Sequence, residues 1–365
     1  MASPPTTNGK LSDLARHVVV PSRLASTGWP AVRDRCADLG IEFDVWQDGA
    51  GRIILSKRLD GTYATTVGGV VLSIPRQVGK TFLFGAIAFA LCLLFPGLTV
   101  VWTAHHTATA DETFASMQGF ARRRKIDPHV DKVLIDDMTV VFKNGSRVMF
   151  GARERGVGRG FALVDVLVFD EAQILTERAI DDMVPSQNQA PNPLLLFAGT
   201  PPKPNDPSEV FTNKRMKALS GTSDDMAFIE FSADEDADPD DRDQWAKANP
   251  SYPTRTPASA VLRMRENLTH DSFMREGLGI WASTGSHSVI DAATWATCKD
   301  EASQPVDRFA LAVDVSPDRD VASVGFAGER ADGSWHVELD EQRHGTGWLA
   351  AYIEDRVQRN PIRAV

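Results

Sequence analysis

The chain has 365 residues, of which 42% are hydrophobic and 24% are charged. This composition is typical of a globular protein with a real core, and the length allows two domains or one domain with additions. The formal net charge of −10 argues against a uniformly basic nucleic-acid-binding protein. Ten acidic residues and one arginine lie between residues 224 and 243, however, and we expect this segment to be a solvated acidic loop. DNA could therefore still bind a basic face elsewhere on the protein.

The cysteines and the apolar segments narrow the class of protein. Cys36, Cys92 and Cys298 show neither metal-ligand nor disulfide spacing, which suits a reducing cytosol. The most apolar segment, residues 82–95, is too short to span a bilayer, so it predicts a buried helix. The polar first ten residues show no signal peptide, and we expect no membrane partner.

The first predicted element is a polar arm, residues 1–40, that ends in a short helix at residues 31–39. The sequence Phe43-Asp-Val-Trp46-Gln47 follows it. The side-chain amide of Gln47 could read the adenine edge of a nucleotide, as in nucleotide-driven motors. A packed tryptophan with an exposed neighbour is the alternative, and both interpretations stay open at this stage.

Residues 73–81, Ser-Ile-Pro-Arg-Gln-Val-Gly-Lys-Thr, lie between an apolar run at 67–72 and the predicted helix at 82–95. A strand, a tight loop and a helix in this order are the setting of a phosphate-binding loop. In such a loop Lys80 would reach the terminal phosphates and Thr81 would ligate Mg²⁺. Ile74 stands where the first glycine of the usual pattern is expected. The predicted ATP-binding residues of the loop are Arg76, Gln77, Val78, Gly79, Lys80 and Thr81.

The next elements are a buried strand at residues 98–103 and a helix at residues 109–125. The loop between them contains His105 and His106, which lack metal spacing and are predicted to be loop residues that contact DNA or nothing. The basic run from Arg122 to Lys125 is either a DNA-binding patch or the polar end of the helix.

Residues 138–142 and 147–150 flank Asn144-Gly145, which predicts a β-hairpin. The glycine-rich sequence Arg153-Glu-Arg-Gly-Val-Gly-Arg159-Gly160 follows. Arginine neutralises the charge that develops in phosphoryl transfer, and the glycines would let one of these side chains reach a neighbour's nucleotide. A mobile surface loop is the alternative.

Four apolar residues, Val166 to Phe169, are followed by Asp170 and Glu171, which predicts a buried parallel strand with two carboxylates at its C-terminal end. In a nucleotide hydrolase the first carboxylate holds Mg²⁺ through water and the second takes a proton from the attacking water. A core strand with a solvated turn is the alternative. The phosphate-binding loop upstream favours the first interpretation.

A helix at residues 176–184 precedes another buried strand, which ends at Gly199-Thr200-Pro201. In nucleotide-driven motors a polar residue at such a strand end senses the γ-phosphate and relays its loss. The four apolar strands therefore predict an α/β fold with a parallel sheet flanked by helices.

The remainder of the chain contains a helical segment and then a second segment of strands. Helices at residues 258–268 and 270–281 predict a helical linker, after a stop at Asn249-Pro250. From residue 309 onward three strands, a helix and a fourth strand describe the opening of a ribonuclease-H-like nuclease. Asp314 on the first strand is a candidate metal ligand, with Asp318 or Asp320 as weaker candidates. A strand-end acid is the alternative for Asp314.

Together these features resemble the large terminase subunit of tailed double-stranded DNA bacteriophages, from about residue 43 to the last residue. The resemblance is carried by landmarks in the family's order: Arg76-Gln-Val-Gly-Lys-Thr81, Arg159-Gly160, Asp170-Glu171-Ala172, Gly199-Thr200-Pro201, Trp245 with Asn249-Pro250, and Val313-Asp314. It implies a P-loop NTPase of the additional-strand, RecA-like type, followed by the linker and the first part of the nuclease. The implied domains are an arm at 1–40, an ATPase domain at 41–235, an acidic loop and linker at 236–300, and an incomplete nuclease at 301–365.

The resemblance also implies a role for each motif residue. Gln47 would contact adenine, Lys80 and Thr81 would bind phosphate and Mg²⁺, Asp170 would hold the metal, and Glu171 would activate water. Arg76 would contact phosphate in its own subunit, and Arg159 would act on the neighbour's ATP. Gly199 and Thr200 would belong to the coupling motif, and Asp314 would bind the nuclease metal.

The implied protein is a motor that uses ATP and Mg²⁺ to pump double-stranded DNA into a prohead. Its partners would be that DNA, the portal protein, the small terminase subunit and further copies of itself in a ring. It would act in the host cytoplasm and transiently at the portal vertex. A helicase-like DNA-dependent ATPase and a non-catalytic fragment that binds DNA or portal are the alternatives; the first lacks support because no second helicase lobe is visible.

The nuclease portion leads to a first testable expectation. Because the sequence stops where the second nuclease carboxylate of the family would follow, we expect the chain to hydrolyse ATP but not to cut DNA by itself. Incubating the purified chain with supercoiled plasmid and Mn²⁺ should leave the plasmid intact. Nicked or linear product that EDTA suppresses would contradict this expectation.

Overall fold

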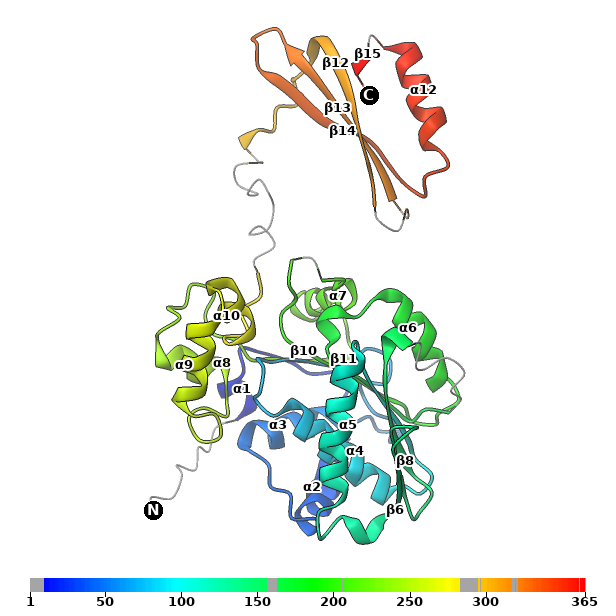
Figure 1. Ribbon diagram of the computed structural model, residues 1–365, viewed down its shortest axis with the longest axis vertical. Helices are drawn as coiled ribbons and strands as arrows, with labels where there is room; N and C mark the ends of the chain where they lie inside the picture. Colours follow the sequence, from blue (N-terminus) through cyan, green and yellow to red (C-terminus); the bar gives the residue numbers. More distant parts are fainter. Residues whose placement is uncertain are drawn as a thin grey trace. The chain divides into compact units, whose positions relative to one another are not determined.

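The computed structural model describes residues 10–155, 163–204, 206–282, 295, 297–316, 319, 321–360 and 362–364. The chain divides into two compact units, Met1–His287 and Ser288–Val365 (Figure 1). Among the described residues, none of the helices combines the length and the apolar character that crossing a bilayer requires.

The first unit is built on a nine-stranded sheet with the order β1-β11-β4-β10-β9-β5-β8-β7-β6. Neighbouring strands from β11 to β8 are parallel, whereas β1, β7 and β6 join the edges in antiparallel pairs. The strands of this sheet are β1 (His17–Val19), β4 (Gly69–Ser73), β5 (Thr99–Ala104), β6 (Val130–Leu134), β7 (Thr139–Phe142), β8 (Arg147–Ala152), β9 (Val166–Phe169), β10 (Leu194–Gly199) and β11 (Met226–Glu230). Two short strands, β2 (Ser26–Thr27) and β3 (Ser56–Lys57), form a separate pair.

Helices cover both faces of this sheet because its central strands are apolar on both sides (Figure 1). Val70 and Leu72 of β4 lie in one core cluster, and Val71 between them lies in the other. The first cluster takes residues from α1 (Leu11–Leu14), α2 (Trp29–Asp38), α3 (Val45–Ile54), α4 (Lys80–Leu94) and α5 (Thr107–Ala121). The second takes residues from α6 (Glu177–Met183) and α7 (Glu209–Leu219). The predicted α/β fold, with a mostly parallel sheet flanked by helices, is therefore confirmed.

A third core cluster belongs to the predicted helical linker, here called the helical subdomain, residues 233–281. Its helices are α8 (Arg242–Ala248), α9 (Ala258–Asn267) and α10 (His270–Glu276). Trp245 and Phe273 are buried at its centre. This subdomain is part of the first compact unit.

The order of the strands brings the predicted motifs to one edge of the sheet. β10 lies between β4 and β9, and β5 lies on the other side of β9. Because these strands are parallel, their C-terminal ends meet at one edge. The phosphate-binding loop, the carboxylates and Thr200 all follow those ends.

Two expectations are corrected by the sheet. The segment expected to be a solvated acidic loop contains β11, which is buried along its whole length and pairs with β4. The prediction was wrong because the many acidic residues on both sides outweighed the short apolar sequence Met226-Ala-Phe-Ile. Glu230 at the end of that sequence is buried because it pairs with Arg215. Residues 17–19, expected to lie in a polar arm, form β1 at the edge beside β11.

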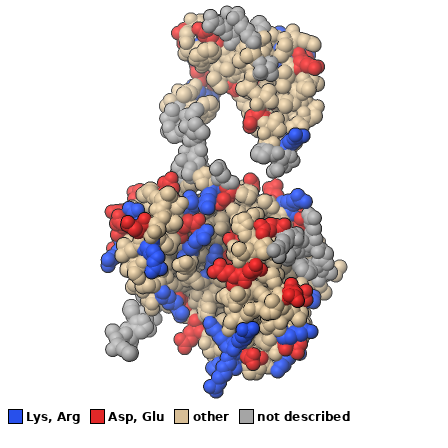
Figure 2. All heavy atoms as spheres, viewed as in Figure 1, with Lys and Arg blue, Asp and Glu red and all other residues tan. Residues whose placement is uncertain are grey.

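The basic run after α5 is exposed. The helix ends at Ala121, so Arg122, Arg123, Arg124 and Lys125 follow it rather than forming its last turn. Figure 2 shows Lys and Arg side chains gathered at the lower end of the first unit, where α5 ends in Figure 1. Both interpretations of this run, a polar helix end and a DNA-binding patch, assumed such exposure.

The second unit contains a four-stranded sheet with the order β14-β13-β12-β15. The first three strands are antiparallel neighbours, and β15 is parallel to β12. The elements are β12 (Pro305–Val315), β13 (Val321–Arg330), β14 (Trp335–His344), α12 (Leu349–Arg359) and β15 (Ile362–Ala364). The predicted succession of three strands, a helix and a fourth strand is confirmed.

Candidate active site

The phosphate-binding loop has the backbone shape that an anion requires. Gly79 has φ 110° and directly precedes Lys80, the first residue of α4. Glycine adopts this left-handed conformation without strain, and the first N–H groups of α4 have no acceptor within the helix. They lie at the positive end of the helix dipole, so a polyphosphate is the ligand that suits this position. Ile74, in place of the usual glycine, is fully buried in the core.

The predicted cation and carboxylates of the site come together. Nζ of Lys80 lies 3.4 Å from Oδ1 of Asp170, and the two side chains are 18% and 6% exposed. Lys80 begins the helix after β4, whereas Asp170 follows β9, two strands away in the sheet. Chain segments ninety positions apart therefore meet at one point, as the sequence predicted. Thr81, the predicted Mg²⁺ ligand, is the second residue of the same helix.

Glu171 is held in an unusual conformation beside Asp170. Its φ of 52° lies in the left-handed region, which is unfavourable for a residue with a side chain. One carboxylate oxygen accepts from the backbone N–H of His105 at 3.1 Å, and the other accepts from the Thr109 hydroxyl at 3.1 Å. Both partners lie at the start of α5, which also has the positive end of a helix dipole. The carboxylate is thus ordered but half-buried, within reach of a water molecule.

Gln47 has its amide engaged inside the protein. Its side-chain oxygen accepts from the backbone N–H of Asp44 at 3.0 Å, which caps α3, and its nitrogen donates to the carbonyl of Gly79 at 3.4 Å. The residue is 3% exposed. The amide keeps a second N–H donor and a second acceptor lone pair, but its burial means that contact with an adenine ring would require neighbouring residues to move. The contact with Gly79 nevertheless puts Gln47 directly against the phosphate-binding loop.

The helical subdomain binds the phosphate-binding loop through hydrogen bonds and an ion pair. The hydroxyl of Ser251 donates to the carbonyl of Val78 at 3.0 Å, and the indole N–H of Trp281 donates to the hydroxyl of Ser73 at 2.9 Å. Arg76, predicted to contact phosphate, forms an ion pair with Glu276 at 2.5 Å. Its side chain is 57% exposed, so the guanidinium can also face a ligand. No sequence pattern indicated Ser251, Glu276 or Trp281, because these contacts join segments 173 to 208 positions apart.

The predicted coupling motif ends β10 next to the carboxylate turn. Thr200 is 1% exposed, and among the described residues its hydroxyl has no hydrogen-bond partner. A Cβ atom on Gly199 would lie 2.6 Å from the side-chain oxygen and 3.0 Å from the backbone nitrogen of Gln173, so a larger residue there would require Gln173 to move. Gln173 belongs to the turn after Glu171. The coupling motif therefore lies against the turn that follows the two carboxylates, a proximity that the sequence did not reveal.

Two ionisable groups around the start of α5, Glu154 and His105, have shifted pKa values. Hydrogen bonds from the hydroxyl and backbone N–H of Thr107 lower the pKa of Glu154 to about 2. Burial lowers the pKa of His105, and the neighbouring Arg153 guanidinium acts in the same direction. His105 therefore stays neutral at pH 7. Its backbone N–H, rather than its ring, contacts Glu171.

The other predicted site residues are placed as follows. Arg159, with Gly160, lies outside the described residues, as do Asp318 and Asp320. Asp314 lies on β12 in the second unit and is exposed. Among the described residues there is no group of three or more His, Cys, Asp or Glu side chains that could hold a metal ion.

A nucleotide-bound Mg²⁺ ion does not need such a group. Mg²⁺ in nucleotide sites takes most of its ligands from phosphate and water, with one or two from the protein. The hydroxyl of Thr81 and the buried carboxylate of Asp170 provide donors of that kind at the edge that carries Lys80. The residues of the first unit therefore fit Mg²⁺ bound together with a nucleotide.

Comparison with known proteins gives one family and several solved structures. A family model described as "Terminase large subunit, T4likevirus-type, N-terminal" matches residues 71–258, more than half of the chain. The large terminase of bacteriophage HK97 is similar in structure, with a TM-score of 0.64 and 19% identity over 93% of this chain and 74% of that chain. The ATPase domain of the Thermus phage P74-26 large terminase gives a TM-score of 0.47 and 15% identity over 68% of this chain and 97% of that chain. No curated protein sequence matches significantly.

Proposed function

Because this chain belongs to the T4likevirus-type large terminase subunit family, we propose that it is an ATP-hydrolysing motor subunit that moves double-stranded viral DNA into a prohead. The observation that carries the proposal is the meeting of Lys80 and Asp170 at 3.4 Å beside the free N-terminus of α4. An ammonium group, a carboxylate that can hold Mg²⁺ and N–H groups without an acceptor inside the helix, all at one sheet edge, suit a nucleoside triphosphate bound with Mg²⁺.

Each residue of the site has a task in that reaction. Lys80 and the N–H groups at the start of α4 would bind the β- and γ-phosphates. Bound Mg²⁺ would neutralise phosphate charge during transfer, with Thr81 and Asp170 as its protein-side donors. Glu171 would accept the proton of the attacking water, because its carboxylate is held by two hydrogen bonds beside Asp170. Gly199 and Thr200 would pass the loss of the γ-phosphate onward through Gln173.

The arginines complete the proposal. Arg76 would exchange Glu276 for a phosphate group of its own subunit, since its guanidinium is more than half exposed. Arg159 would act on the ATP of a neighbouring copy in a ring. The proposed partners are double-stranded DNA, portal protein and small terminase subunit. The proposed place of action is the host cytoplasm and the portal vertex.

The nuclease assignment of the second unit is also part of the proposal. The arrangement of β12, β13, β14, α12 and β15 supports it, because the strand order is that expected of the opening of a ribonuclease-H-like domain. Asp314 is the one predicted metal ligand that the structure describes there. We propose no cleavage step, because the described residues bring no group of carboxylates together.

Stimulation by DNA tests the motor function. Double-stranded DNA should raise the ATP turnover of the wild-type chain, because a packaging motor couples hydrolysis to the DNA that it grips. We expect the variant Arg122→Gln/Arg124→Gln to need on the order of tenfold more DNA for half-maximal stimulation, because two cations of the exposed run are lost. The increase should become smaller at high salt.

The variant Arg263→Gln/Arg265→Gln on α9 removes the same charge elsewhere and is the matched control. Equal DNA dependence of the two double variants would show that the Arg122–Lys125 face does not bind DNA. If DNA left the turnover of the wild-type chain unchanged at every concentration, the motor function itself would be contradicted.

A further inference from the structure

Arg153 stands at the junction of three strands and is turned into the protein. It follows β8, and its guanidinium reaches across β5 to the end of β9. Nη1 donates to the carbonyl of Thr103 at 3.2 Å and to the carbonyl of Asp170 at 2.8 Å, and Nη2 donates to the carbonyl of Glu171 at 3.1 Å. Nη1 also lies 3.3 Å from the Thr103 hydroxyl. One side chain thus binds the main chain of both Asp170, the predicted metal ligand, and Glu171, the predicted general base.

These hydrogen bonds keep the Arg153 guanidinium inside the protein. Burial lowers the pKa of its guanidinium to about 10, and the Glu171 and Asp170 carboxylates oppose that decrease, so the group keeps its charge at pH 7. Nε is buried and has no partner among the described residues. Both terminal nitrogens are engaged with main-chain carbonyl groups. The Thr103 and Glu171 carbonyls also accept from the backbone N–H groups of Asp170 and Ile174. Arg153 is therefore unlike an arginine that extends toward a neighbour's phosphate.

The left-handed conformation of Glu171 gives these contacts their importance. A glutamate with φ 52° is strained and persists only when its surroundings fix it. Arg153 donates to the carbonyl groups on both sides of the Glu171 N–Cα–C unit, that is, to those of Asp170 and of Glu171 itself. The fork of guanidinium N–H groups can hold two carbonyls at once, which an ammonium group on a flexible stem does less well.

Glu154, the residue after Arg153, fixes the side chain of Glu171 indirectly. The Glu154 carboxylate accepts from the backbone N–H of Thr107 at 2.8 Å and from its hydroxyl at 2.5 Å. This caps α5. The first turn of α5 and the residue before its N-cap supply the two donors that hold the Glu171 carboxylate. Two consecutive residues after β8 therefore fix the main chain of Glu171 and the helix that holds its carboxylate.

We propose that Arg153 is a positioning residue that holds the Asp170–Glu171 turn in the geometry required for ATP hydrolysis, without touching the nucleotide. This inference rests on the proposed function, because it requires Glu171 to act as the general base. It separates Arg153 from Arg159, the arginine for which a role toward a neighbouring copy is proposed. The expected signature is a loss of kcat with little change in nucleotide affinity.

The test compares Arg153→Lys and Arg153→Gln with the wild-type chain at saturating ATP and Mg²⁺. We expect kcat to fall by about 10- to 100-fold in both variants, because a small displacement of a catalytic group has effects of this size. The dissociation constant of a fluorescent ADP analogue, titrated separately, should change less than about twofold, because Lys80 and α4 keep their positions. Arg153 and the exposed Arg178 of α6 line one surface cavity. Arg178→Gln is therefore the matched control and should keep the wild-type kcat.

A double-variant cycle with Glu171→Gln distinguishes positioning from general damage. If Arg153 acts through Glu171, then adding Arg153→Lys to Glu171→Gln should lower the residual rate no further. Additive losses, or a wild-type kcat in Arg153→Lys, would overturn the proposal. Should Arg153→Gln fail to fold, which its melting curve would reveal, Arg153→Lys decides because it keeps the charge and one donor nitrogen. Wild-type turnover no greater than that of Glu171→Gln would instead refute the proposed function.

Discussion

Replacing Glu171 by Gln is expected to lower the rate of ATP hydrolysis by about 10²- to 10⁴-fold, the effect of losing a general base. An amide cannot take the proton of the attacking water, although it has nearly the same size and shape. Its side-chain oxygen can still accept from the His105 N–H or from the Thr109 hydroxyl, so the turn should keep its position. Nucleotide affinity should stay within a few-fold of wild type, because Lys80 and α4 are unchanged.

The measurement is steady-state phosphate release at saturating ATP, with Glu177→Gln as the control. Glu177 lies on α6 and is exposed, so the same chemical change there should leave the rate unaffected. Because the proposed role of Arg159 requires a neighbouring copy, both variants are to be compared with wild type at the same high protein concentration. A Glu171→Gln variant that retains wild-type turnover would exclude Glu171 as the base.

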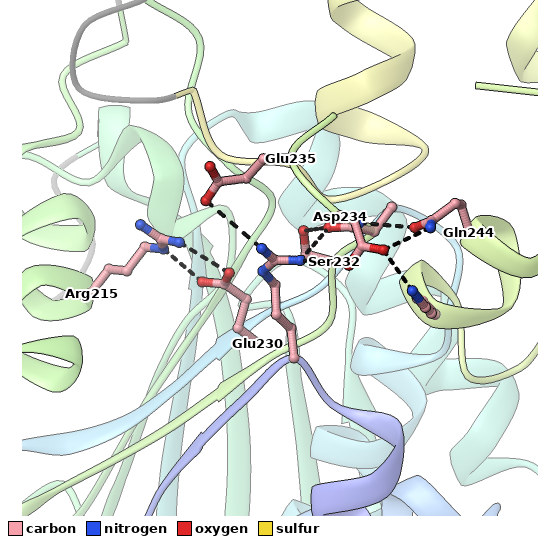
Figure 3. Close-up of polar contacts among 9 residues, drawn as sticks. Arg215, Glu230, Ser232, Asp234, Glu235 and Gln244 are labelled. Atoms are coloured by element: carbon pink, nitrogen blue, oxygen red, sulfur yellow. Dashed lines mark hydrogen bonds and ion pairs between the residues drawn. The ribbon is translucent and has the colours of Figure 1, made fainter. Parts of the chain in front are cut away.

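The largest expected effect on stability concerns Arg215 and Glu230. Glu230 ends β11 with a side chain only 1% exposed, and Arg215 of α7 contacts both of its carboxylate oxygens, at 2.6 Å and 3.1 Å (Figure 3). Arg215→Met would leave a buried carboxylate without its cation. Breaking a buried pair on one side costs about 3 to 5 kcal/mol. We expect the melting temperature to fall on the order of 10 °C.

Two further variants identify the cause of that loss. Arg52→Met removes an exposed partner of Asp48 on α3 and should cost about 1 kcal/mol or less. The double variant Arg215→Met/Glu230→Leu removes both charges and should recover much of the lost stability, because the penalty comes from the unpaired carboxylate. If the double variant were as unstable as Arg215→Met, the lost packing of Arg215 over the Trp281 ring, 4.8 Å from its centroid, would be the cause instead.

The local parts of the site were predictable from the sequence. Each of Lys80, Asp170 and Gly199 stands directly after a run of apolar residues or at the start of one, so the strand and helix patterns placed them at the ends of elements. Parallel strands between helices then required those ends to meet at one edge. The distance between Lys80 and Asp170 agrees with that reasoning.

The parts that depend on pairing between distant segments were not predictable. The sequence does not show that β11 pairs with β4, because an apolar strand of five residues was hidden among acids. Nor does it show that Gln47 contacts Gly79, or that Ser251 and Trp281 contact the phosphate-binding loop. Such contacts are set by how subdomains pack, and each involves one ordinary polar residue without a motif around it.

The contacts between the helical subdomain and residues 73–78 also determine where a shorter recombinant fragment of the protein can end. A shortened ATPase that stopped after β11 would leave the Ser73 hydroxyl and the Val78 carbonyl without their partners and would remove Trp281 from the core beside α7. Its phosphate-binding loop would then be free to collapse or to expose apolar surface. A recombinant fragment intended for crystallisation or for inhibitor screening therefore has to extend at least through Trp281.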